Sequence, residues 1–176
     1  MKIYKLYHRV DGYKAIDTKN TKLEKDFVDF GNDVDFSKHV GETFNWSGNL
    51  SDKISHYPFI DGSTLVIDEK AYRVIEPIIA QYVSTYEILV NGIRFKIIDP
   101  VVVSGILNTE HSIIKYFKDG RIMNIKKYAF NKKENIPPIF KIQELKTFTF
   151  VVEDIINALK LEGIMEGLDF VECEII

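Results

Sequence analysis

The residues that could carry acid–base or metal chemistry are spread thinly along this chain. The histidines His8, His39, His56 and His111 stand far apart in the sequence, and none belongs to a paired motif such as His-Glu-x-x-His. A histidine outside such a pair is more often a hydrogen-bonded structural residue than a metal ligand. The spacing therefore predicts no zinc site and no other bound metal.

Motifs for covalent or phosphate chemistry are also absent from the sequence. There is no Gly-x-Ser-x-Gly elbow and no glycine-rich phosphate loop. Asp33 and Asp35 form an Asp-x-Asp that could hold a cation, and Asp29 begins a kinase-like Asp-Phe-Gly triplet, but the other kinase motifs are missing. Cys173 lies in a predicted terminal strand with no histidine near it in sequence, which favours a small core residue. We predict a protein that is not an enzyme and has no cofactor, while a site assembled from distant residues would escape such a search.

The segment 24–36 offers a different chemistry, protein binding, because acidic residues alternate there with large apolar ones. Aromatic anchors surrounded by acids suit a basic partner. The alternative is a strand or loop that buries the phenylalanines and leaves the acids in water. The candidate partner-binding residues are Asp26, Phe27, Asp29, Phe30, Asp33, Asp35 and Phe36.

Charge is distributed unevenly over the second half of the chain. Residues 112–147 contain 9 Lys and Arg against 3 Asp and Glu, a net charge of +6, whereas residues 148–176 contain 1 against 7, a net charge of −6. These segments could be two solvated surfaces or neighbours that attract each other. The lysines interleaved with Tyr116, Tyr128 and Phe130 could also suit a nucleic acid. The hairpin pattern assigns much of this aromatic content to the core, however, so we predict no nucleic-acid partner.

Composition indicates an ordinary globular chain. With 176 residues, 45% of them hydrophobic, and a net charge of −3, the chain is long enough for a core that needs no disulfide or structural metal. The single Cys173 fits a reducing compartment. Lys5 and Arg9 interrupt the apolar residues at the start, and the apolar stretch 97–107 is too short to span a bilayer. We expect a cytoplasmic protein without a membrane partner.

The elements that must position these residues begin with a strand over Ile3 to Tyr7. Residues 14–56 are rich in Gly, Asp, Asn and Ser, which predicts loops around short elements. Residues 65–67 form a buried-strand pattern, and Asp68 is placed to cap a following helix. Pro77 should kink or end that helix, because it lacks an N–H and its ring crowds the preceding turn.

Two β-hairpins follow. Asn91-Gly92 is typical of a type I′ turn, which pairs Val90 with Ile93 and places Ile88 opposite Phe95 on a core face. The same construction is predicted around Asp119-Gly120, with Ile114, Tyr116, Met123 and Ile125 on one face.

The last third of the chain predicts strands over 139–142 and around 147–150, then a helix that starts near residue 153 and is capped by Gly163, and a final strand from Leu168. Residues 100–107 are apolar but undecided between a strand end and a short helix. The expected fold class is α+β: an antiparallel sheet built from hairpins with two main helices, in a single domain over residues 1–176.

A longer pattern links these elements. Tyr57-Pro-Phe is followed by Leu-Val-Ile-Asp-Glu-Lys-Ala-Tyr at 65–72, by Ile-Ile-Asp-Pro-Val at 97–101 and by Tyr-Phe-Lys-Asp-Gly-Arg-Ile at 116–122, and the chain later has Gly-Leu-Asp-Phe at 167–170. This order resembles bacterial immunity proteins of polymorphic-toxin systems, in the family typified by a myxobacterial immunity domain. The resemblance covers residues 57–172, whereas residues 14–56 form a variable part that matches only through Trp46. Val152 departs from the family pattern, because a capping serine is usual there.

The resemblance implies a small cytoplasmic antidote that is encoded beside a toxin, binds the toxin domain and neutralises it by forming a stoichiometric complex. The shared positions are mainly apolar, Gly and Pro, so they describe a scaffold and imply no catalytic residues. Two alternatives stay open: a small enzyme that reverses a toxin's modification, and a generic protein or nucleic-acid interaction module.

Overall fold

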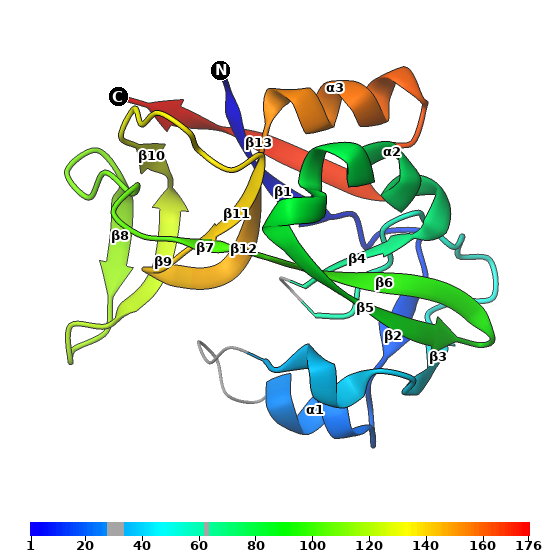
Figure 1. Ribbon diagram of the computed structural model, residues 1–176. Helices are drawn as coiled ribbons and strands as arrows, with labels where there is room; N and C mark the ends of the chain where they lie inside the picture. Colours follow the sequence, from blue (N-terminus) through cyan, green and yellow to red (C-terminus); the bar gives the residue numbers. More distant parts are fainter. Residues whose placement is uncertain (28–33, 62–63) are drawn as a thin grey trace.

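The computed structural model describes residues 1–27, 34–61 and 64–176, and most of the regular structure is β (Figure 1). The larger sheet has six strands in the order β10 (Ala129–Phe130), β13 (Leu168–Ile175), β1 (Ile3–His8), β12 (Leu145–Val152), β11 (Ile139–Ile142) and β7 (Val102–Val103). The second sheet has five strands in the order β2 (Ala15–Asp17), β3 (Thr43–Ser47), β5 (Val83–Val90), β6 (Ile93–Pro100) and β4 (Leu65–Asp68). A separate hairpin pairs β8 (Ile113–Tyr116) with β9 (Ile122–Lys127).

Helices connect and cover these sheets. The two longer helices, α2 (Glu69–Ile79) and α3 (Glu153–Leu161), pack beside each other, which confirms two main helices in a mixed α and β chain. The shorter helical elements are α1 (Lys22–Phe27) and the 3₁₀ turns η1 (Phe36–His39) and η2 (Ala80–Tyr82). No helix in the described ranges is long and apolar enough to cross a membrane.

The sheets are mixed, so the expectation of a purely antiparallel sheet is wrong. Three strand pairs run parallel: β3 with β5, β10 with β13, and β7 with β11. Parallel neighbours need a long crossover, and the chain between β3 and β5 includes β4 and α2. Hairpin signals in a sequence report only adjacent antiparallel strands, which is why these pairs were not predicted.

Alternating side chains along the strands feed three apolar clusters. In β4, Leu65 and Ile67 join a cluster with α2 and α3, while Val66 joins a second cluster under α1 and η1. In β12, Val151 faces the helices and Phe150 faces a third cluster that the β8–β9 hairpin partly covers. The period of two along a strand therefore places apolar side chains on both faces of each sheet.

The local signals for the first helix and the first hairpin are confirmed. The N–H of Ala71 donates to Asp68 Oδ1 at 2.8 Å, so Asp68 caps α2. Pro77 lies inside α2, and the helix ends two residues later at Ile79 and continues as η2. The hairpin pairs Val90 with Ile93 around Asn91 (φ 46°) and Gly92 (φ 79°), as a type I′ turn requires.

The second hairpin forms where expected, but with another turn and register. Gly120 has φ +85° whereas Asp119 does not have a positive φ, and the Gly120 N–H donates to Phe117 O at 3.1 Å. This is a type I turn followed by a left-handed glycine, not a type I′ turn. Tyr116 then pairs with Ile122 instead of Met123, and the register shifts between Lys115 and Tyr116. The irregularity turns Ile122 toward the core and leaves Tyr116 and Met123 exposed.

Candidate functional site

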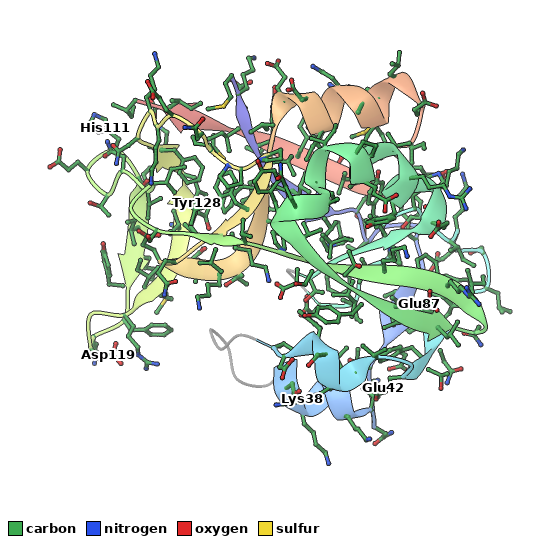
Figure 2. All side chains as sticks on the ribbon, in the orientation of Figure 1. Lys38, Glu42, Glu87, His111, Asp119 and Tyr128 are labelled. Atoms are coloured by element: carbon green, nitrogen blue, oxygen red, sulfur yellow. The ribbon has the colours of Figure 1, made fainter. Side chains whose placement is uncertain are left out.

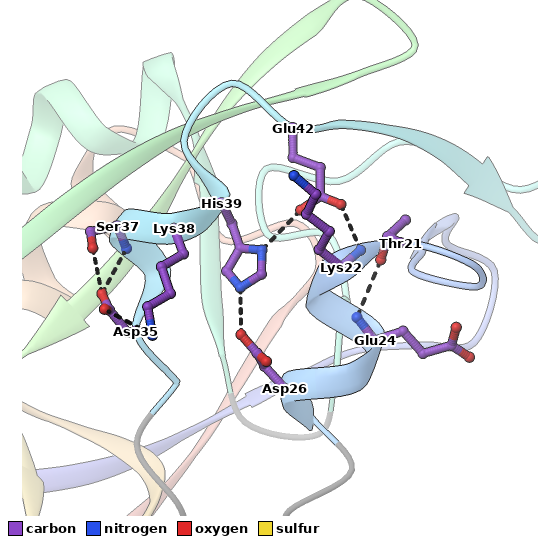
Figure 3. Close-up of polar contacts among 9 residues, drawn as sticks. All are labelled: Thr21, Lys22, Glu24, Asp26, Asp35, Ser37, Lys38, His39 and Glu42. Carbon is purple, nitrogen blue, oxygen red and sulfur yellow. Dashed lines mark hydrogen bonds and ion pairs between the residues drawn. The ribbon is translucent and has the colours of Figure 1, made fainter.

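The predicted partner-binding segment connects α1 to η1, and a buried histidine joins its two described ends (Figure 3). His39 Nε2 lies 2.7 Å from Asp26 Oδ2 on α1, and His39 Nδ1 lies 2.9 Å from Glu42 Oε2 just before β3. Both ring nitrogens thus face carboxylate oxygens, and both can donate only if the imidazole is doubly protonated. Only 3% of the His39 side chain is exposed, whereas the side chains of Glu42 and Asp26 are 18% and 42% exposed, so a buried imidazole links two carboxylates that reach the surface.

Glu42 has a second role at the start of α1. The Lys22 N–H donates to Glu42 Oε1 at 2.9 Å, so one carboxylate binds both His39 and the first turn of the helix. A helix of six residues is too short to be stable alone in water. The Asp26–His39–Glu42 triad therefore holds α1 against η1.

Replacing His39 by leucine is expected to lower the free energy of unfolding by about 2 kcal/mol, because Asp26 and Glu42 both lose their hydrogen-bond partner in the buried imidazole. Amide hydrogen exchange should show loss of protection in α1 ahead of the rest of the chain. Glu42→Gln is the matched control, since it keeps an acceptor for Lys22, and its cost should stay below about 1 kcal/mol. Equal protection of α1 in wild type and His39→Leu would contradict this role.

The other candidate residues of the segment have diverse surroundings. Asp35 is exposed and caps η1, because the Ser37 N–H donates to its Oδ1 at 3.2 Å, and its Oδ2 lies 3.5 Å from Lys38 Nζ. Hydrogen bonds from Ser37 hold the pKa of the Asp35 carboxyl below its usual value. Phe36 is buried in the cluster beneath the five-stranded sheet, so its ring serves the core and is not presented as a surface anchor. Asp29, Phe30 and Asp33 lie outside the described residues, as does the side chain of Phe27.

The β8–β9 hairpin presents the apolar side chains that the segment 24–36 was expected to present. Ile114, Ile122 and Ile125 pack on the body, while the hairpin exposes Ile113, Tyr116, Phe117 and Met123, with Tyr116 51% and Phe117 45% exposed. The interpretation that places Tyr116 in the core is wrong, because Tyr116 is exposed at the end of β8 although it pairs with Ile122. Tyr128 and Phe130 are buried as predicted.

The hairpin is also basic. Lys115, Lys118, Arg121, Lys126 and Lys127 lie on it, against Asp119 as its one acid. Figure 2 shows Asp119 at the hairpin tip, away from the two large sheets. Lys127 Nζ pairs with Glu174 of β13 at 2.5 Å, so part of the attraction between the basic and acidic segments holds the hairpin base on the body. The remaining cations face solvent near the exposed aromatic rings.

The remaining titratable side chains do not assemble into a reactive centre. The ring nitrogens of His8 lie 3.1 Å from Tyr57 O and 3.0 Å from Thr64 O, and burial lowers the pKa of His8. His56 pairs with the capping residue Asp68 at 2.6 Å. Burial raises the pKa of Cys173 to about 12, which disfavours the nucleophilic thiolate. In the part of the chain that the structure describes, no three His, Cys, Asp or Glu side chains form a group that could hold a metal ion.

Against known proteins, neither the protein-family models nor the curated proteins give a match to this chain.

Proposed function

We propose that this chain is an immunity protein that binds a cognate bacterial toxin domain and neutralises it by forming a one-to-one complex. The sequence resemblance over residues 57–172 supports the class. The observation that carries the proposal is the β8–β9 hairpin, which exposes Ile113, Tyr116, Phe117 and Met123 beside several cations. Exposed aromatic side chains next to basic ones are typical of binding surfaces, where the rings anchor and the charges select the partner.

The positive charge of the hairpin indicates the charge of the partner surface that it would bind. Among the residues that the structure describes, Lys115 and Lys118 have no acidic partner, and Arg121 pairs only with Asp119 of the hairpin itself, at 2.8 Å. An acidic patch on the toxin would neutralise these cations and increase the association rate. A complex tight enough for protection should bury roughly 1,600 Å² in total, so the hairpin would form the centre of a wider contact.

The segment 26–36 remains a second candidate surface within the same function. Asp35 and Asp26 lie on its described ends, but Asp26 is held by His39 and Phe36 is buried. A basic toxin surface could therefore contact the acidic side chains of this segment, but the buried ring of Phe36 would not contribute to that interface. The two candidate surfaces call for toxins of opposite charge, which makes them separable by experiment.

The class is tested with the toxin domain encoded next to this chain. We expect a stable one-to-one complex by light scattering after size exclusion, with Kd in the nanomolar range or below by calorimetry, about 12 kcal/mol of binding free energy. Protection should require one antidote per toxin. Full protection by far less than one equivalent would indicate an enzyme, and survival of cells without any complex would contradict the proposal.

Reversing Lys115, Lys118 and Arg121 to glutamate is expected to weaken toxin binding by about a hundredfold or more, because like charges then face each other across the interface. The matched control reverses three exposed lysines elsewhere, Lys19, Lys25 and Lys70, and should change the affinity by less than about threefold. Reversal of Asp29, Asp33 and Asp35 tests the other surface without disturbing the Asp26–His39 pair. If only this last variant loses affinity for the toxin, the interface lies on the segment 26–36.

One observation favours a second function. Tyr116 and Phe117 are exposed on a basic hairpin, and stacking rings beside lysines can bind single-stranded nucleic acid. Such binding would fall steeply with salt and would not need the toxin. Retention of a labelled oligonucleotide that Tyr116→Ala abolishes would favour this function over toxin neutralisation.

A further inference from the structure

Lys5 is a buried lysine without a counter-charge. It lies in the middle of β1 in the six-stranded sheet and is only 5% exposed. Within residues 1–27, 34–61 and 64–176, no carboxylate lies within ion-pair distance of its Nζ. Isolated buried ammonium groups are costly, so a lysine in this position is expected to have either an unusual environment or a ligand.

Three aromatic rings surround the Lys5 ammonium. Its Nζ lies 3.2 Å from the ring centre of Phe148, 4.6 Å from that of Tyr7 and 4.9 Å from that of Tyr128. The electron-rich faces of these rings attract the ammonium and replace part of the hydration that it loses on burial. They carry no net charge, however, and so leave the positive charge of Lys5 uncompensated.

Lys5 lines a pocket of about 320 Å³ between β1, β9 and β13. Tyr128 lines the same pocket, and its hydroxyl oxygen is buried without a hydrogen-bond partner among the described residues. A buried hydroxyl without a partner is rare, because it loses its bonds to water and gains none. Two residues that line one pocket thus carry polar groups without partners: Lys5 has no counterion, and the Tyr128 hydroxyl, which solvent does not reach, has no hydrogen-bond partner among the described residues.

The other charges of the pocket wall are partly paired. Glu172 binds Lys2 at 2.9 Å and Glu174 binds Lys127 at 2.5 Å, so both acids are already neutralised. Lys126 also lines the pocket and is exposed at its rim. With both glutamates paired, the lining cations that remain are Lys5, which is buried, and Lys126, which is exposed. A ligand with one negative charge would pair with the buried Lys5, whereas a dianion would bring a second charge that no buried cation compensates.

We propose that this pocket binds a carboxylate group, with the Lys5 ammonium as its counter-charge and the Tyr128 hydroxyl as a hydrogen-bond donor. The rings of Tyr7 and Tyr128 and the side chain of Val171 would contact a short apolar body next to the carboxylate. The volume is at the lower end of small-molecule sites, which limits the ligand to a small acid or one acidic side chain. The site does not depend on the proposed function, although Lys126 and Lys127 of the pocket lining also belong to the β8–β9 hairpin.

The protonation of the pocket wall suits an anion. Burial lowers the pKa of Lys5 to about 8, so the group is still mostly charged at neutral pH. Burial raises the pKa of Cys173 to about 12 and also raises the pKa of Tyr128, so both remain protonated and neither places a competing negative charge beside Lys5. A bound carboxylate would favour the charged amine and raise the pKa of Lys5.

The test uses the whole chain with ¹³C-labelled lysine, followed by NMR during titration with sodium benzoate. We expect a saturable shift of the Lys5 Cε–Hε signal and a rise of its pKa by about 1 or more, while exposed Lys115 stays unchanged. Benzamide, which lacks the charge, and inorganic phosphate should bind at least about tenfold more weakly. Equal shifts of Lys5 and Lys115, or equal binding of benzamide, would overturn the proposal.

Variants separate the pocket from general effects. Lys5→Met should weaken benzoate binding by about tenfold or more, and Tyr128→Phe by about threefold or more, whereas Lys115→Met should leave it unchanged. Lys126→Ala changes only the exposed rim of the pocket and should weaken benzoate binding about twofold. This variant keeps the test valid if Lys5→Met fails to fold. Unchanged affinity in both Tyr128→Phe and Lys126→Ala would reject the site.

Titration with N-acetylglutamate amide then identifies where the bound carboxylate comes from. Binding comparable to that of benzoate indicates an acidic side chain of a protein, and binding of benzoate alone indicates a free small acid.

Discussion

Phe150→Ala is expected to lower the free energy of unfolding by about 4 kcal/mol, the largest effect of a single substitution in this chain. Phe150 is fully buried in β12, and its ring lies 4.9 Å from Tyr128, 5.2 Å from Phe130 and 5.6 Å from Phe140 between ring centres. Truncation leaves a cavity that these rings cannot close without leaving their own packing, so the loss includes a cavity cost as well as the transfer of the ring.

Urea unfolding followed by circular dichroism measures this loss, with an unchanged slope confirming that both proteins unfold in the same way. The control is Phe117→Ala, the same substitution at the exposed hairpin tip, which should change the free energy of unfolding by less than about 0.5 kcal/mol. A loss below about 1 kcal/mol in Phe150→Ala would mean that the four rings do not form a packed unit.

Gly167→Ala is expected to destabilise the protein by about 3 kcal/mol, from two independent causes. Gly167 has φ +92°, a conformation that disfavours a side chain, and a Cβ there would lie 2.3 Å from Ser55 Cβ and 2.6 Å from Ser55 Oγ. Ser55 is buried, and its Oγ accepts the Tyr57 N–H at 3.2 Å, so it is not free to move away. The loop before β13 would have to separate from the 55–57 turn.

The control for this prediction is Gly163→Ala, which also has a positive φ, +66°, but has no atom within 4 Å of the added Cβ. It should cost about 1 kcal/mol, the conformational part alone. Adding Ser55→Gly to Gly167→Ala should recover part of the difference in a double-mutant cycle. Equal losses in Gly163→Ala and Gly167→Ala, measured by thermal unfolding, would show that contact with Ser55 is not the cause.

The predictions from sequence that held depend on residues close together in the chain. Asn91-Gly92 decides the turn type, and the turn type decides that Val90 pairs with Ile93. Asp68 caps α2 through the N–H of Ala71 three residues later. Gly163 follows α3, and the Ile164 N–H donates to Leu159 O at 2.9 Å, as in a Schellman motif.

The candidate site could be predicted only in part. The segment 24–36 was found from its alternation of acids and aromatic residues, but the sequence does not show that Phe36 faces inward or that Asp26 binds His39 thirteen residues later. The exposed rings of the hairpin were missed because the sequence shows neither the register shift that places Tyr116 opposite Ile122 nor how far the hairpin tip lies from the two large sheets (Figure 2). A glycine after an aspartate fits two turn types, and the sequence pattern does not distinguish them.

By itself, the sequence determined the two longer helices, the caps at Asp68 and Gly163, and the places of the two hairpins, because these depend on contacts between residues a few positions apart. Only the tertiary structure decided which strands pair in parallel and which side chains share a pocket. Lys5 comes from β1, Cys173 from β13 and Tyr128 from the junction of β9 and β10, and nothing in their neighbourhood in sequence marks them. Burial of Lys5 without a counter-charge follows from packing across the whole sheet, so it is a property of the fold and not of any segment.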